Sequence, residues 1–180
     1  MESLIAAAAR ALARGDPLHA LKLVALRNDA PGLALRGIAM AQLGELPRAR
    51  QLLRAAHRAF GARERLSRAR CVLAEAEVAL AMRDLPASAR ALQGARETLS
   101  SLGDGINATH AAYVEVRALV LSGQLELARQ RLDAMPAAPS PALQVTHALL
   151  AAHVAMAGVQ AGLADEALQR ARQLAEKARI

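Results

Sequence analysis

The chain has 180 residues and a formal net charge of +7, and its length suits one domain or one uninterrupted repeat array. Alanine (46 residues) and leucine (30) dominate, whereas valine and isoleucine together supply 13 residues and the aromatics only 2. This composition excludes an all-β fold and a buried parallel sheet, because strands need β-branched and aromatic side chains. It favours helix throughout, and an apolar fraction of 54% excludes a disordered chain.

Apolar periodicity and helix-start signals predict ten helices in five antiparallel pairs. Proline at 17, 47, 86 and 141 marks four helix starts, because a proline at the first helical position loses no hydrogen bond. The first helices of the pairs are expected at about 2–14, 31–43, 62–82, 106–122 and 141–161. Their partners are expected at about 17–28, 46–59, 86–101, 125–134 and 164–179.

A short sequence pattern recurs along the chain, in which a turn residue is followed by a predicted helix. Its five copies begin at Gly15, Gly44, Arg83, Gly123 and Gly162. Five residues after each turn stand Ala20, Ala49, Ser88, Ala128 and Ala167, and seven residues before each turn stand Ala8, Gly37, Ala76, Val116 and Ala155. Nine of these ten residues are Ala, Gly or Ser. Small side chains let the two helices of a pair approach closely, so the pattern predicts five helical hairpins at about 1–30, 31–60, 61–102, 103–138 and 139–180.

The positive charge is concentrated in one segment. Residues 48–70 hold eight arginines and one acid, Glu64, which accounts for the whole net charge. Arg50, Arg54 and Arg58 follow a spacing of four residues and would form one ridge on a helix, with Arg63 beyond its end. Such a patch is either a solvated helix face or a docking surface for nucleic acid or an acidic protein segment.

Catalytic and metal-binding patterns are absent from the sequence. No phosphate-binding glycine loop or nucleophile elbow occurs, and no two of the five histidines are spaced by four residues. The lone cysteine, Cys71, can form no disulfide framework within the chain and suits a reducing cytoplasm. We therefore expect no enzyme activity, no cofactor and no metal site, and we expect a cytoplasmic location.

The small residues on either side of a turn of the Gly-Asp type resemble the tetratricopeptide repeat (TPR). A leucine or valine four residues after the second small residue (Val24, Leu53, Leu92 and Leu132) adds to the resemblance, which spans essentially the whole chain. The large aromatics common in the family's first helices are absent, and the turns are 29, 39, 40 and 39 residues apart instead of 34. The longer period resembles helical repeats of bacterial transcription regulators. The resemblance implies an all-α, right-handed α-solenoid of about five antiparallel helix pairs in a single domain, residues 1–180, that binds protein.

In the TPR family the first helices line the concave face. Carried over to this chain, the resemblance implies an apolar trough with one polar patch that would accept a protein or peptide segment, in particular an amphipathic helix. The residues expected to form the partner-binding groove are Arg70, Leu73, Glu77, Leu80, His110, Tyr113, Arg117 and Val120. Any of the apolar members could instead belong to the core.

A run from Ala134 to Ala164 contains no charged residue. Its prolines, glutamines and histidines argue against a membrane span, so we expect its apolar helix, 141–161, to be covered by another chain in a homo-oligomer or by a further domain. The sequence ends without a helix stop signal, which suggests the N-terminal part of a longer protein.

These observations predict a protein-interaction scaffold or sensor domain. The resemblance to helical repeats of bacterial transcription regulators implies that it is the regulatory half of such a regulator. The alternative is a nucleic-acid-binding helical repeat protein that uses Arg48–Arg70. The two differ in their response to salt, because phosphate contacts weaken steeply with ionic strength whereas an apolar groove is nearly insensitive to it.

Overall fold

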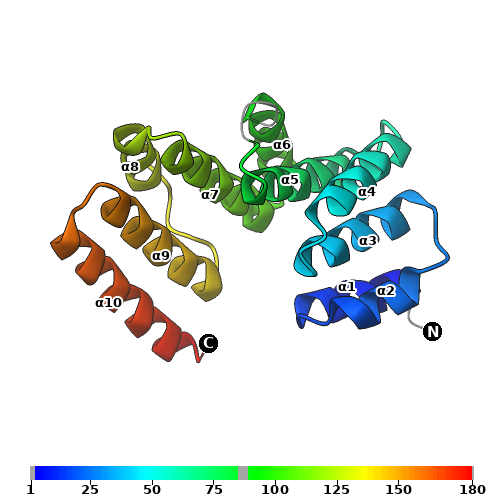
Figure 1. Ribbon diagram of the computed structural model, residues 1–180, viewed down its shortest axis with the longest axis horizontal. Helices are drawn as coiled ribbons and strands as arrows, with labels where there is room; N and C mark the ends of the chain where they lie inside the picture. Colours follow the sequence, from blue (N-terminus) through cyan, green and yellow to red (C-terminus); the bar gives the residue numbers. More distant parts are fainter. Residues whose placement is uncertain (1–2, 85–88, 180) are drawn as a thin grey trace. The chain divides into compact units, whose positions relative to one another are not determined.

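A computed structural model describes residues 3–84 and 89–179 of the chain, and these residues form helices joined by short turns, without a strand (Figure 1). The all-α expectation is confirmed. The helices are α1 (Leu4–Ala13), α2 (Pro17–Val24), α3 (Ala30–Gln42), α4 (Leu46–Ala59), α5 (Arg65–Ala81), α6 (Ala89–Ser101), α7 (Gly105–Leu121), α8 (Leu125–Asp133), α9 (Pro141–Ala157) and α10 (Ala161–Ala178). Each observed end lies within four residues of the predicted one.

Short polar side chains start several of these helices. The capping side chains, each of which accepts a hydrogen bond from the backbone N–H three residues later, are Ser3, Asp16, Asp29, Asp104 and Ser140. Each cap satisfies a donor that the helix itself leaves without a partner. The predicted helix starts at Pro17 and Pro141 are confirmed; the one at Pro86 lies outside the described residues.

The same turn closes the first helix of each hairpin. A residue with positive φ follows the helix, and the next N–H donates to the carbonyl five residues earlier at 2.9 Å in all five cases. The positive-φ residues are Gly15, Gly44, Arg83, Gly123 and Val159. The predicted fifth turn at Gly162 is therefore wrong by three residues: Gly162 lies in the first turn of α10, and α9 ends at Ala157, short of the predicted 161.

Small residues stand where the helices of a hairpin meet. The buried positions seven residues before the turns are Ala8, Gly37, Ala76, Val116 and Ala152. The buried positions five residues after the turns are Ala20, Ala49, Ala128 and Ala164, and Ser88 lies outside the described residues. The corrected turn thus replaces the predicted fifth pair, Ala155 and Ala167, by Ala152 and Ala164.

The chain divides into two compact units, residues 1–102 (unit 1) and 103–180 (unit 2). In unit 1, α3 packs against α1, α2, α4 and α5, and α5 also packs against α4 and α6. Its core is built largely from alanine and leucine, with Phe60 and Cys71 also buried. Because alanine fills so little space, the helices lie close together and few large side chains are needed between them.

In unit 2, α9 packs against α7, α8 and α10, and α7 packs against α8. Figure 1 shows α9 and α10 side by side, running in opposite directions. Tyr113 is the largest fully buried side chain of this unit, and it lies among aliphatic residues of α7, α8 and α9. Two helices that meet at this aromatic residue, α7 and α9, also form the candidate site of unit 2.

Candidate functional site

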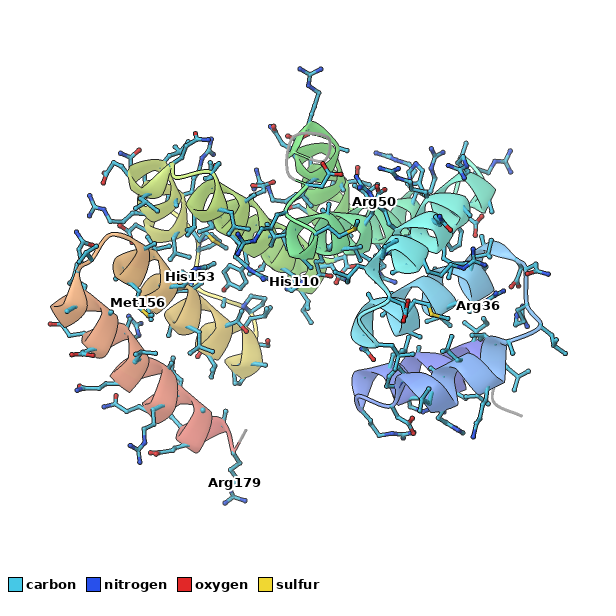
Figure 2. The ribbon with its side chains drawn as sticks, viewed as in Figure 1. Arg36, Arg50, His110, His153, Met156 and Arg179 are labelled. Atoms are coloured by element: carbon cyan, nitrogen blue, oxygen red, sulfur yellow. The ribbon has the colours of Figure 1, made fainter. Side chains whose placement is uncertain are left out.

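A groove of about 250 Å³ lies between α7 and α9 in unit 2 (the α7–α9 groove). Its lining residues are His110, Tyr113, Val114, Arg117, Thr146, Leu149, Leu150 and His153. His110 comes from α7 and His153 from α9, and Figure 2 labels both. The groove therefore combines an apolar surface with polar side chains from two neighbouring first helices.

The lining joins an exposed apolar side chain to polar and charged ones. Leu149 is 49% exposed although it belongs to a largely apolar helix, so an apolar partner side chain could reach it. Arg117 is exposed and contributes a positive charge to the lining. His110, Thr146 and His153 contribute polar atoms. An apolar side chain next to a carboxylate would match this combination.

Tyr113 anchors the floor of the α7–α9 groove. Its hydroxyl donates a hydrogen bond of 3.1 Å to the carbonyl oxygen of Leu143, and its ring meets the ring of His147 edge-on at 5.8 Å. Burial raises the pKa of the Tyr113 hydroxyl. Burial, followed by the positive charge of Arg170, lowers the pKa of His147. Both shifts favour the neutral form of the side chain, and the edge-on contact packs the His147 ring against Tyr113, which lines the groove.

The two walls of the α7–α9 groove are equivalent positions of the repeat. Thr146, Leu149, Leu150 and His153 each stand 36 residues after a lining residue of α7, and 36 residues also separate the turns at Gly123 and Val159. Of these eight lining residues, the sequence analysis named His110, Tyr113 and Arg117, and it did not name Val114 or the four α9 residues. The signal was present, because the α9 residues share one helix face, but the misplaced fifth turn shifted the alignment by three residues.

The other predicted groove residues occupy different surroundings. Leu73 and Leu80 are buried in α5 with exposed fractions of 4% and 3%, and Val120 is buried in the core of unit 2. Arg70 is exposed and Glu77 half-buried on α5, and both have interaction partners. The α5 residues belong to unit 1 and the α7 residues belong to unit 2.

A second groove lies in unit 1, between α4 and α6 and over α5 (the α4–α6 groove). It consists of two adjoining hollows of about 220 and 290 Å³ that share His57, Val72 and Ala91. The remaining lining residues are Arg54, Arg58, Ala62, Arg65, Arg68, Ala69, Glu75, Ala76, Gly94, Ala95 and Thr98. Four arginines and one acid thus surround a surface of small apolar residues.

The predicted arginine ridge is divided by ion pairs within unit 1. Arg50, which Figure 2 labels, pairs with Asp84 at 2.5 Å and with Glu75 at 3.5 Å, and only 15% of its side chain is exposed. The hydrogen bond to Asp84 raises the pKa of Arg50. Arg54 pairs with the same Glu75 oxygen at 2.6 Å. These two arginines therefore join α4 to α5, whereas Arg58 and Arg63 are exposed.

His57 joins α4 to α5 by a second link. Its Nδ1 lies 3.3 Å from the carbonyl oxygen of Arg68, and its Nε2 lies 3.4 Å from the guanidinium of the same residue. Both contacts are satisfied at once when Nδ1 carries the proton and donates while Nε2 accepts. This link holds the Arg68 guanidinium beside the α4–α6 groove.

The end of unit 2 exposes several large apolar side chains. Met156, Val159, Leu163 and Leu168 have exposed fractions of 60%, 90%, 52% and 43%. The predicted self-association through 141–161 stays a prediction.

Among residues 3–84 and 89–179, no cluster of three or more His, Cys, Asp or Glu side chains could hold a metal ion. Within the same ranges, no helix has both the length and the apolar character that crossing a membrane requires. No protein-family model, curated protein or solved structure matches the chain.

Proposed function

We propose that the chain is a protein-interaction module of TPR-like helical hairpins, an α-solenoid without catalytic chemistry of its own. The proposal is supported by the turn that recurs at Gly15, Gly44, Arg83, Gly123 and Val159 and by the small residues that flank it. A repeated hairpin places equivalent faces of successive helices next to one another, which creates extended surfaces for partner chains.

The observation that carries the proposed function is the α7–α9 groove. Its two walls come from equivalent positions of two hairpins, and it joins the exposed Leu149 to the exposed Arg117. A partner segment with a large apolar side chain would bury that side chain against Leu149 and Leu150. An aspartate or glutamate beside it would pair with Arg117, which supplies charge complementarity as well as apolar contact.

A selection of displayed 12-residue peptides on the whole chain tests this function. We expect enrichment of peptides that carry an aromatic or aliphatic residue close to an acidic one. Leu149→Glu places a charge inside the groove, so it should weaken binding of a selected peptide at least about tenfold, since one buried apolar side chain contributes roughly 1.5–3 kcal/mol. Arg117→Ala should weaken binding of the acidic peptides and not of versions with glutamine in place of the acid.

Leu163→Glu is the matched control, because Leu163 is also about half exposed in unit 2 but does not line the α7–α9 groove. It should leave peptide binding unchanged. Equal loss of binding in the two glutamate variants would contradict the proposal, and so would a selection that enriches no peptide sensitive to Leu149→Glu.

A further inference from the structure

We propose that the α4–α6 groove of unit 1 is a second docking surface and that its occupant is an acidic, amphipathic protein segment. The groove is separate from the α7–α9 groove, because its lining residues all belong to α4, α5, α6 and the turn before α5. Three properties of the lining carry the proposal: its charge, its apolar floor and its length.

The positive charge of the α4–α6 groove favours binding of an anionic partner. Unit 1 carries the whole net charge of +7, and the acids and bases of unit 2 balance at seven each. Glu75 offsets part of the charge of Arg54, and the Arg68 guanidinium contacts the His57 ring. Arg58 and Arg65 line the groove without an ion pair among the described residues. Both can therefore bind a carboxylate without first giving up a partner.

The floor of the α4–α6 groove distinguishes between anionic partners. Val72 and Ala91 are shared by both hollows, and Ala69 and Ala76 extend the apolar surface on either side. A Cβ added at Gly94 would meet nothing within 4 Å, which shows open space above α6. Apolar side chains of a protein segment can fill this space, whereas phosphates gain nothing from it. Stacking of nucleotide bases would need exposed aromatic rings, and Phe60, which follows the last residue of α4, is buried. The lining therefore favours a protein segment over nucleic acid.

The length of the α4–α6 groove sets the length of its occupant. The lining residues on α5 extend from Arg65 to Ala76. At a rise of 1.5 Å per residue this stretch is about 17 Å long, which equals roughly three turns of a partner helix. A helix with small apolar residues on one face and glutamates on both flanks would place alanine and leucine over Val72 and carboxylates near Arg58 and Arg65.

The test is fluorescence anisotropy with the whole chain and three labelled 14-residue peptides. All three share alanine and leucine on one helical face, and the flanking positions hold glutamate, glutamine or lysine. A 14-nucleotide single-stranded DNA is the fourth probe. We expect the glutamate peptide to bind at least tenfold more tightly than the other three probes at 50 mM NaCl, and to weaken at 300 mM NaCl because part of the attraction is screened.

Two variants separate a specific groove from a general positive field. The double variant Arg58→Glu and Arg65→Glu reverses the two lining charges and should weaken binding of the glutamate peptide at least tenfold. The double variant Arg14→Glu and Arg63→Glu changes the net charge equally at exposed positions of unit 1 outside the lining, and it should retain most of the affinity. Ala91→Trp fills both hollows without changing charge and should also weaken binding at least tenfold.

Equal weakening by the two double variants would overturn the proposal, because attraction would then depend on net charge alone. Tighter binding of the DNA than of the glutamate peptide, lost on reversal of Arg58 and Arg65, would replace it with a nucleic-acid surface. Equal binding of the glutamate and glutamine peptides would also overturn it. None of these outcomes bears on the α7–α9 groove, which is tested with Leu149→Glu, so failure of one surface is distinguishable from failure of the other.

Discussion

Gly37 on α3 lies against Leu53 on α4 so closely that a Cβ built on the glycine would come within 2.8 Å of Leu53 Cγ and 3.2 Å of the Leu53 backbone nitrogen. Gly37 occupies the small-residue position seven residues before the turn at Gly44, and Leu53 is 1% exposed. The close approach of α3 and α4 therefore depends on the absence of a side chain at Gly37, and not on flexibility of its backbone.

Gly37→Ala should destabilise unit 1 although alanine is the better helix former. The added methyl group must displace Leu53 or separate α3 from α4, which costs about 1–3 kcal/mol in a packed core. Gly94→Ala is the matched control: it is another helical glycine, but its added Cβ meets nothing, so it should stabilise by roughly 0.5–1 kcal/mol. Urea denaturation of both variants measures the difference, and equal effects of the two substitutions would show that Gly37 is not a packing site.

Much of the fold can be predicted from the sequence because its signals are local. Proline and capping residues mark helix starts, and a small residue on each side of a turn marks a hairpin, so the ten helices are predicted to within four residues. The exception is informative. Val159 adopts, with φ of 58°, the left-handed conformation that glycine adopts at three of the other four turns. Because no glycine stands at 159, the pattern placed the turn at Gly162, three residues too far along.

The candidate grooves could be predicted only in part, because they depend on which side chains of a helix face a neighbour. His110 and Arg117 were named because the resemblance to TPR repeats places the first helices on the concave face, whereas Leu149 and His153 needed the correct turn register. The arginine ridge was found from its spacing, but its ion pairs with Glu75 and Asp84 join residues 21 to 34 positions apart. The spacing of residues along one helix carries no information on such distant partners. Which arginines form ion pairs could therefore not be predicted from the sequence.

Val159→Gly should stabilise unit 2. Valine is β-branched and pays for a positive φ by crowding between its Cβ and the following carbonyl oxygen. Val159 is 90% exposed, so its removal loses almost no buried area. We expect a gain of about 1 kcal/mol, the crowding energy reduced by the greater freedom of glycine in the unfolded chain. Val159→Ala keeps the Cβ and should gain much less. A loss of stability in the glycine variant would contradict this account of the turn.

The stability of unit 2 should decline as the pH falls from 7.5 to 5.5. Burial, and then the charge of Arg170, lower the pKa of His147 from 6.5, so in this interval the unfolded chain binds a proton more readily than the folded one. The loss begins as the pH passes the unfolded value and levels off below the folded pKa. Urea denaturation at several pH values measures it.

Two variants identify His147 as the source of that pH dependence. His147→Gln removes the titrating ring and should flatten the pH dependence, although it lowers stability at every pH by removing the contact with Tyr113. Arg170→Gln removes one of the causes of the shift and should flatten the dependence partly. An NMR titration of the ring protons assigns the pKa directly, and a value of 6.5 or above would refute the argument.

Cys71 should resist thiol reagents until unit 1 unfolds. It is 4% exposed on α5, and burial raises the pKa of its thiol to about 11, so almost no reactive thiolate is present at neutral pH. Because it is the one cysteine of the sequence, labelling reports on this site alone. We expect slow labelling in buffer, complete labelling in guanidinium chloride, and faster labelling of Gly37→Ala than of the wild-type chain. Rapid labelling of the native chain would show that α5 is not packed as described.

Glu75→Gln should affect stability and binding in opposite directions. The carboxylate of Glu75 accepts from Arg54 at 2.6 Å and from Arg50 at 3.5 Å, so its loss should lower stability by about 1 kcal/mol. Glu75 is also the acid of the α4–α6 groove. Removing its charge should strengthen binding of the glutamate peptide about threefold, since a unit charge several ångströms away in a solvated groove contributes roughly 0.7 kcal/mol.

Asp84→Asn separates the two effects of Glu75→Gln. Asp84 pairs with Arg50 at 2.5 Å but does not line the α4–α6 groove, so its substitution should lower stability without strengthening peptide binding. Urea denaturation and anisotropy on the same preparations measure both quantities. If both variants strengthen binding equally, net charge and not the lining of the groove governs the affinity. If Glu75→Gln weakens binding, the carboxylate positions Arg54 for the partner instead of competing with it.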